Sequence, residues 1–334
     1  MPHPRPVLVA PDSFKGTLST AQVTTAIARG MQTSGWAVDR CSVADGGEGT
    51  LDVLLEALGG ERVAAGAHDP LGRPLTASFA LLGDGRRAVV ETASASGLGL
   101  VAESERDAER ASTQGTGELI AAAVAAGARE VLVGAGGSAT TDGGAGALAS
   151  IERAGGLGDA RLTVLCDVRT AFEQAARVFA PQKGADADAV RRLTLRLNRQ
   201  ARALSTDPRG VAMTGCAGGL SGGLWAALGA RLAPGAAFVL EALGFDPRAR
   251  SARAVVTGEG RLDRQSLAGK VVGEVATRCR QAGIPCHAIV GQAQIDPFEQ
   301  RILDLTSVDQ AGTVAAIQRV AQTLGERLHA ESER

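Results

Sequence analysis

Short apolar runs, each ending in glycine or charged residues, alternate with helical patterns at both ends of the chain. Strands are predicted at 6–10 (PVLVA), 37–43, 252–257 (ARAVVT), 285–290 (PCHAIV) and 302–308. Helices are predicted at 18–32, 51–58, 271–281 and 313–329. Apolar runs followed by helices are typical of a parallel sheet covered on both faces. Five such strands predict a doubly wound, flavodoxin-like α/β domain.

The middle of the chain follows a different pattern. Strands predicted at 62–67, 75–82 and 87–92 are separated by turns at 69–74 and 83–85, which is typical of antiparallel pairing. Further strands at 130–133 and 162–165 alternate with helices at 119–126, 145–151, 188–204 and 224–232. We therefore predict a flavodoxin-like domain from 1–60 and 246–334, with a second α/β domain of mixed sheet, 61–245, inserted in it. The ligand site is expected in the cleft between them.

A glycine-rich loop at 134–146 (GAGGSATTDGGAG) connects the strand at 130–133 to a helix. Glycines in such a turn let an oxyanion lie against backbone N–H groups near the positive end of the helix. The loop therefore predicts phosphate binding, with these candidate residues: Gly136, Gly137, Ser138, Thr140 and Gly143.

One acid, Asp142, lies inside this loop. No Lys-Ser or Lys-Thr follows the glycines, so the loop is not a Walker motif, and a dinucleotide fingerprint would place its acid about 20 residues downstream. An acid among phosphate-binding amides either holds a metal ion or accepts a substrate proton. The alternative is that Asp142 caps the following helix.

Polar residues also follow the first two predicted strands. The ends of parallel strands meet at one edge of a sheet, where ligands of open α/β folds bind. These residues are therefore candidates for the site, although Asp and Gly also form ordinary turns. They are Asp12, Ser13 and Lys15 after the first strand, and Asp45, Gly46, Gly47 and Glu48 after the second.

Four further segments add candidates. Glu91 ends a strand and precedes small hydroxylated residues, so it either binds a polyol or is an edge-strand glutamate. The turn 112–118 (STQGTGE) opens a helix and offers a second anion site. The candidates from this turn, from PQKG and from the loop after 252–257 are Thr113, Gly115, Thr116, Lys183, Glu259, Arg261 and Asp263.

Composition excludes several classes of protein. With 45% hydrophobic residues among 334, the chain can bury a large core. Its 35 Lys and Arg balance 36 Asp and Glu, so no basic surface for nucleic acid or anionic lipid is expected. Five cysteines without a CxxC pair argue against a disulfide framework or structural zinc. Without a long apolar segment or a signal-peptide pattern at the N-terminus, we expect a cytoplasmic protein.

Eight motifs occur in order between residues 11 and 266: PDSFKGT, ADGGEGT, ETASASGL, STQGTGELI, GAGGSATTDGGAG, CDV, PQKGA and TGEGRLDRQS. Together they resemble the type 1 glycerate kinase family. The resemblance implies two α/β domains and the phosphorylation of D-glycerate by ATP and Mg²⁺ to 2- or 3-phosphoglycerate. The chain departs from the family pattern at Thr141, where Asn is usual, and in a shorter segment after residue 150.

Phosphoryl transfer needs a cation at the phosphate, carboxylates for Mg²⁺ and a base for the acceptor hydroxyl. Lys15 is the first candidate for the cation and Lys183 the second. The expected Mg²⁺ ligands come from Asp45, Glu48, Glu259 and Asp263. Asp142 is the first candidate for the base, Asp45 the second, and Arg261 or the 112–117 turn would bind the glycerate carboxylate.

Two alternatives remain open: a kinase for another small hydroxy acid, and a non-catalytic sensor of sugar acids or nucleotides. A nicotinamide oxidoreductase is disfavoured because no GxGxxG follows the first strand. The hydroxyl that is phosphorylated, and the choice between monomer and homodimer, also stay open.

Overall fold

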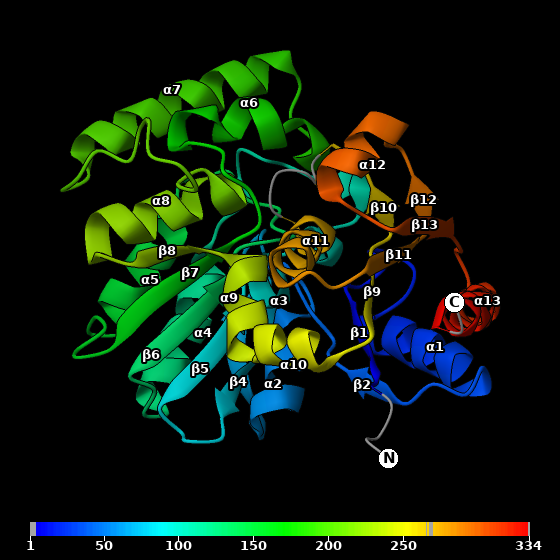
Figure 1. Cartoon of the computed structure of the whole chain (residues 1–334). Helices are drawn as coiled ribbons and strands as arrows, with labels where there is room; N and C mark the ends of the chain where they lie inside the picture. Colours follow the sequence, from blue (N-terminus) through cyan, green and yellow to red (C-terminus); the bar gives the residue numbers. More distant parts are fainter. Residues whose placement is uncertain (1–4, 265, 267–269, 333–334) are drawn as a thin grey trace. The chain divides into compact units, whose positions relative to one another are not determined.

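A computed structural model describes residues 5–264, 266 and 270–332; of the sequence motifs, only Gln265 of TGEGRLDRQS lies outside these ranges. The chain divides into two compact units, 1–45 with 236–334, and 46–235 (Figure 1). The α/β class, with one parallel and one mixed sheet, is confirmed. No helix in the described ranges is both long and apolar enough to cross a bilayer.

The first unit contains a five-stranded parallel sheet. Its strands lie in the order β13 (Ser307–Gln310), β11 (Cys286–Val290), β9 (Ala254–Gly258), β1 (Val7–Pro11) and β2 (Val38–Arg40). Numbered within this unit, the order is 5-4-3-1-2, which is the flavodoxin order. A two-stranded parallel ladder of β10 (Arg261–Leu262) and β12 (Gln292–Ala293) extends beyond it.

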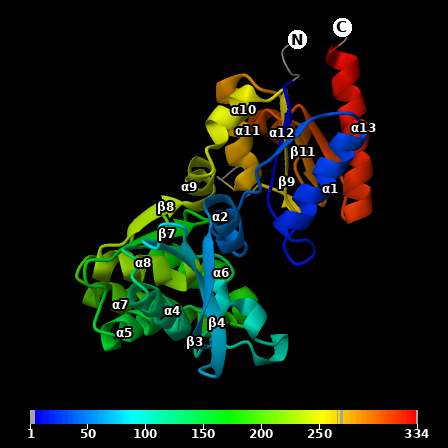
Figure 2. The same ribbon diagram turned by 90° about the horizontal axis from the view of Figure 1, so that it is seen from below.

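Helices cover both faces of this sheet. α1 (Thr20–Thr33) and α13 (Val314–Ser332) lie side by side on one face (Figure 2), where they form a buried core with alternate residues of the strands such as Val7, Val9 and Val256. α11 (Val271–Ala282) packs on β1, β9 and β11. The other helices of the unit are α9 (Gly235–Ala242), which begins at its boundary, α10 (Phe245–Ser251) and α12 (Pro297–Leu303).

The second unit contains a six-stranded mixed sheet. The order is β3 (Gly60–His68), β4 (Pro74–Leu82), β5 (Arg87–Glu91), β6 (Glu130–Gly134), β7 (Arg161–Cys166) and β8 (Arg231–Pro234). The pairs β3–β4 and β4–β5 are antiparallel, and the pairs from β5 to β8 are parallel. The antiparallel strands are those that the turns at 69–74 and 83–85 predict.

Three helices share one core with this sheet: α4 (Gln114–Ala125), α5 (Ala145–Arg153) and α8 (Cys216–Leu228). α2 (Thr50–Leu58) packs on β4 and β5. α6 (Ala175–Phe179) and α7 (Ala187–Ala203) form a separate small core around Phe172. The unit also has the short helix α3 (Ala93–Ser96).

The structure differs from the sequence expectations at several elements. α2 belongs to the second unit, because its apolar side packs on the mixed sheet; the units therefore meet at 45/46 and 235/236, not at the predicted 60/61 and 245/246. The strand predicted at 302–308 is wrong at 302–303, because these residues end α12, a helix that begins with a capping box formed by Asp296 and Glu299. The observed strand β13 begins only at Ser307. α9 and α10 lie where no element was predicted, and β8 begins inside the helix predicted at 224–232.

Candidate functional site

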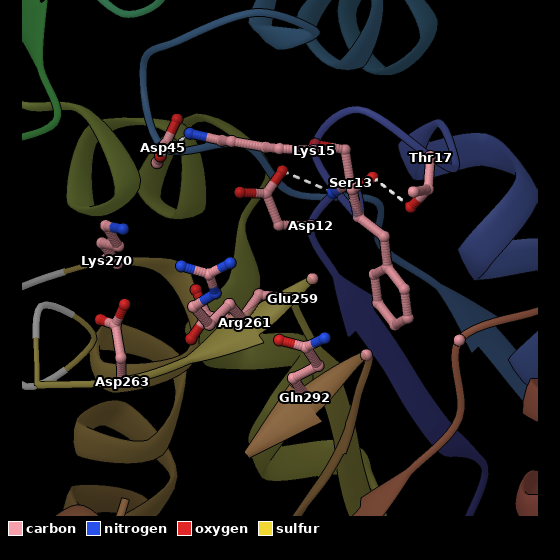
Figure 3. Close-up of a pocket in the computed structure, with 14 residues that line it drawn as sticks. Asp12, Ser13, Lys15, Thr17, Asp45, Glu259, Arg261, Asp263, Lys270 and Gln292 are labelled. Carbon is pink, nitrogen blue, oxygen red and sulfur yellow. Dashed lines mark hydrogen bonds and ion pairs between the residues drawn. The ribbon is translucent and has the colours of Figure 1, made fainter. Parts of the chain in front are cut away.

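The first unit has a pocket of about 520 Å³ at the carboxyl ends of its parallel strands, which we call the carboxyl-end pocket (Figure 3). The loops after all five strands contribute to it, and its size is that of a small-molecule site. It is lined by Asp12, Ser13, Phe14, Lys15, Thr17, Asp45, Glu259, Gly260, Arg261, Asp263, Lys270, Gly291, Gln292 and Gly312. Seven predicted site residues thus lie around one cavity.

Strand register explains why these residues meet. β1 pairs in parallel with β9 up to Pro11 opposite Gly258, and the Asp12 N–H continues the ladder by donating to the Gly258 carbonyl at 2.8 Å. Asp12 and Glu259 are the next residues on the two strands. This is where the sheet order reverses direction, the point at which open α/β folds bind ligands.

Asp12 and Asp45 are buried carboxyl groups, 4% and 2% exposed. Lys15 reaches across the pocket, and its Nζ lies 2.6 Å from Asp45 Oδ2 (Figure 3). Burial, followed by the charge of Asp45, raises the pKa of Asp12 to about 8, although Lys15 and the Ser13 N–H oppose this rise. Asp12 is therefore harder to ionise than an ordinary aspartate.

Glu259 is a third buried carboxyl group in this pocket. Burial raises its pKa to about 7, while a hydrogen bond from the Ser266 hydroxyl and the charge of Lys270 lower it, and Asp263 raises it. The pocket therefore holds acids that are costly to ionise without a further cation.

The Mg²⁺ that the family resemblance implies fits this chemistry. Burial and repulsion by neighbouring acids raise the pKa values of Asp12 and Glu259. A bound divalent cation would offset both effects by stabilising the ionised carboxylates. Within the described ranges, no three His, Cys, Asp or Glu side chains are grouped to hold a metal ion by themselves. Mg²⁺ commonly takes only one or two carboxylates and completes its shell with water and substrate phosphate. The pocket suits that mode of binding.

The second unit has a smaller pocket of about 220 Å³ beside the loops after β6 and β7, which we call the glycine-loop pocket. Its lining includes four residues predicted to bind phosphate, namely Gly136, Gly137, Ser138 and Lys183. The others are Leu98, Ala135, Asp167, Val168, Phe179, Gln182 and Ala217.

Lys183 is 2% exposed in this pocket. Its Nζ donates to the Ser138 hydroxyl at 2.9 Å and to the Thr140 carbonyl at 2.6 Å. Burial lowers the pKa of Lys183 to about 7, although the charges of Asp142 and Asp167 raise it. The ammonium group therefore changes its charge close to physiological pH.

Asp142 has four hydrogen-bond donors around its carboxylate. Oδ2 accepts from the Thr113 N–H and hydroxyl at 2.8 Å each and from the Gly146 N–H at 3.1 Å, and Oδ1 accepts from the Gly144 N–H at 3.1 Å. These bonds tie the start of α5 to the start of α4. They favour the alternative that Asp142 caps a helix, because the four hydrogen bonds already occupy its carboxylate oxygens.

Ten predicted site residues line neither pocket. Glu91 Oε1 accepts a hydrogen bond from the Leu51 N–H at 2.8 Å and so caps α2. Glu91 ends β5, which is an internal strand of the sheet and not an edge strand. Gly143 has a φ of 63°, a left-handed backbone conformation that favours glycine whether or not a ligand binds. Glu48 is exposed. The ten are Gly46, Gly47, Glu48, Glu91, Thr113, Gly115, Thr116, Thr140, Asp142 and Gly143.

Thr113 and Thr116 have structural partners as well. The Thr113 hydroxyl donates to Asp142 and accepts the Ala147 N–H at 3.0 Å, and the Thr116 hydroxyl donates to Ser96 Oγ at 2.8 Å. The turn at 112–117 therefore uses its hydroxyls within the second unit.

The sequence motifs missed Lys270, Gln292 and Asp167 as pocket residues. A signal existed in lysine usage: the chain contains only three lysines, against 32 arginines. Lys15 and Lys270 line the carboxyl-end pocket, and Lys183 lines the glycine-loop pocket. All three lysines thus lie among the 14 and 11 lining residues of these pockets, out of 334 residues in the chain. Outside the pockets, positive charge is supplied by arginine throughout.

Comparison with known proteins agrees with the resemblance seen in the motifs. A sequence model of the glycerate kinase family matches residues 7–154 and 151–331. The glycerate kinase of Bacillus subtilis (strain 168) is 39% identical, with 87% of this chain and 86% of the relative covered, and the glycerate 2-kinase of Escherichia coli (strain K12) is 36% identical at the same coverage.

The fold agrees as well. The crystal structure of "putative glycerate kinase 2 from Salmonella typhimurium LT2" superposes with a TM-score of 0.84 at 31% identity, covering 99% of this chain and 100% of that one. The protein is thus a two-unit α/β kinase. It belongs to the glycerate kinase family. The two matched segments overlap at residues 151–154.

Asp142→Asn tests capping against proton transfer. We expect the free energy of unfolding to fall by about 1–3 kcal/mol, because an amide nitrogen would face N–H donors. Chemical denaturation measures the change in unfolding free energy. Asp186→Asn is the control and should have a smaller effect, because Asp186 caps α7 by accepting only one N–H. A loss of kcat of ~100-fold or more in folded protein would instead assign Asp142 as the base.

Glu91→Gln tests the buried cap of α2. Burial raises the pKa of Glu91 to about 7, so wild-type stability is full below the ordinary value of 4.5 and declines as the pH rises toward 7. A glutamine keeps an acceptor for Leu51 without the charge. Relative to wild type, the variant should gain about 2 kcal/mol in unfolding free energy between pH 5.5 and pH 8. If the difference in unfolding free energy between variant and wild type were the same at pH 5.5 and pH 8, the raised pKa of Glu91 would be contradicted.

Proposed function

We propose that this protein, as a type 1 member of its family, transfers the terminal phosphoryl group of ATP to D-glycerate with Mg²⁺, giving 2- or 3-phosphoglycerate. One observation carries the proposal: two of the three lysines and four carboxyl groups line a single pocket at the switch point of the parallel sheet. Family membership supplies the acceptor, since the relatives are named for glycerate.

In this proposal the carboxyl-end pocket binds the phosphates of ATP. The positive charges of Lys15, Arg261 and Lys270 stabilise the negative charge on the transferring phosphoryl group. The pairing of Lys15 with Asp45 holds the ammonium group in the pocket before the nucleotide arrives. Ser13 and backbone groups of the loop after β1 complete the phosphate site.

One or two of the carboxylates of Glu259, Asp263 and Asp45 would hold Mg²⁺, which would neutralise charge on the phosphates. Glu48, expected as a ligand from the sequence, is outside the pocket lining and is not part of the proposal. Asp45 is also the better supported of the two candidates for the base, because it lines the pocket, whereas four hydrogen bonds occupy the carboxylate of Asp142.

The decisive assay incubates the protein with ATP, Mg²⁺ and D-glycerate and follows the product with two coupling systems. Enolase alone converts 2-phosphoglycerate to phosphoenolpyruvate, and enolase with phosphoglycerate mutase also reports 3-phosphoglycerate. ADP formation that depends on D-glycerate and stops with EDTA is the expected result. ADP formation with another hydroxy acid, but not with glycerate, would identify a different acceptor, and none with any acid would contradict the kinase.

Lys15→Met tests the phosphate role. Because one preorganised cation is lost at the transferring group, kcat/KM for ATP should fall by at least ~100-fold. Arg191→Met, which removes an exposed cation of α7, is the matched control. Wild-type kinetics in a folded Lys15→Met protein would remove Lys15 from the site.

A further inference from the structure

We infer that the glycine-loop pocket is a carboxylate-binding site, and that it takes the carboxylate of the small hydroxy acid that this enzyme phosphorylates. The presence of an anion site follows from the pocket itself. The identity of the acid rests on the proposed function.

The pocket is lined by several hydrogen-bond donors. Among the described residues, the N–H groups of Gly136, Gly137 and Ser138 donate to no protein acceptor. Lys183 adds an ammonium group that has two oxygen partners and is capable of a third bond. Consecutive backbone N–H groups beside a buried cation form a concave site for an oxyanion.

The glycines are required at this place for a second reason. A Cβ at Gly136 would lie 2.5 Å from the Gly47 Cα, so the loop packs directly on another segment of the same unit. That packing fixes the backbone and therefore the direction of the N–H groups. The site is preformed, which lowers the entropic cost of binding.

Charge and size favour a monoanionic acid over a phosphate. The lining has one cation, Lys183, and one carboxylate, Asp167, so the second charge of a phosphate dianion would find no partner and would be repelled. A hydroxy acid instead offers a hydroxyl that Asp167 can accept. Leu98, Val168 and Phe179 provide apolar surface for a short carbon chain, and about 220 Å³ is too small for a nucleoside triphosphate.

Binding at this site is therefore coupled to protonation of Lys183. The charged groups acting on it are Asp142 from the loop after β6 and Asp167 from the loop after β7. Above pH 7 the free protein loses the ammonium charge, and an arriving carboxylate must restore it by taking up a proton. Acid affinity should fall by up to ~10-fold per pH unit above pH 7.

Isothermal titration calorimetry without nucleotide tests this with D-glycerate, glycolate, D-lactate and inorganic phosphate as probes. Titrations at pH 8 in Tris and in HEPES, which differ in ionisation heat, count the protons taken up. The wild type should bind D-glycerate with uptake of up to one proton. Lys183→Met should weaken D-glycerate binding at pH 6.5 by at least ~30-fold and abolish the proton uptake. Arg191→Met, which removes an exposed cation of α7, should leave both unchanged.

Phosphate binding more tightly than every carboxylate, no carboxylate binding to wild type, or unchanged acid affinity in folded Lys183→Met would overturn the inference. If Lys183→Met does not fold, the proton uptake and pH slope of the wild type decide. Failure of the kinase proposal is distinguishable: glycolate or D-lactate would then bind through Lys183 although no phosphoglycerate forms. Conversely, a kinase with Lys183-independent acid binding would keep its function and lose this site.

Discussion

The parallel pairing of β1 with β9 is the constraint on which the candidate site depends. Their register ends at Pro11 and Gly258, so the chain places Asp12 and Glu259 side by side where both strands stop. The strands β2, β11 and β13 end at the same edge of the sheet, and the loops that follow them bring Asp45, Gly291 and Gly312 to the pocket. These acidic and basic residues are far apart in the sequence, and without that alignment they would not share one pocket.

Alignment alone would produce a repulsive cluster of acids, and the lysines balance it. Lys15 pairs with Asp45, and Lys270 lowers the pKa of Glu259, yet burial still raises the pKa values of Asp12 and Glu259. The pocket is therefore suited to a ligand that brings further positive charge together with anionic oxygens. A metal-bound phosphate chain is such a ligand, which connects the electrostatics of the pocket with the chemistry of its family.

The choice of lysine is informative because the chain otherwise uses arginine. A guanidinium group is planar and always charged, whereas an ammonium group is compact and titrates when buried. Lys183, with its pKa lowered to about 7, uses that property, and an arginine there could not release its proton. Lys183 thus marks a position where the two cations are not interchangeable.

Sequence reasoning predicted the features that depend on local pattern. The flavodoxin order followed from five strand–helix units, and Asp12, Lys15 and Asp45 followed from their position after predicted strands. It misassigned α2, whose apolar side gives no information about which sheet it covers. It also attributed ligand binding to glycines such as Gly115, where a Cβ would lie 2.0 Å from the His68 carbonyl oxygen, and such close packing depends on segments distant in sequence.

The most direct test of the account is differential carbamylation of the three lysines by cyanate, followed by peptide mass spectrometry. Mg²⁺-ATP should slow the modification of Lys15 and Lys270, and D-glycerate alone should slow that of Lys183, because each ligand covers the amines of its own pocket. Equal rates at Lys15 and Lys270 with and without saturating Mg²⁺-ATP would contradict the central claim that the carboxyl-end pocket binds the phosphate donor.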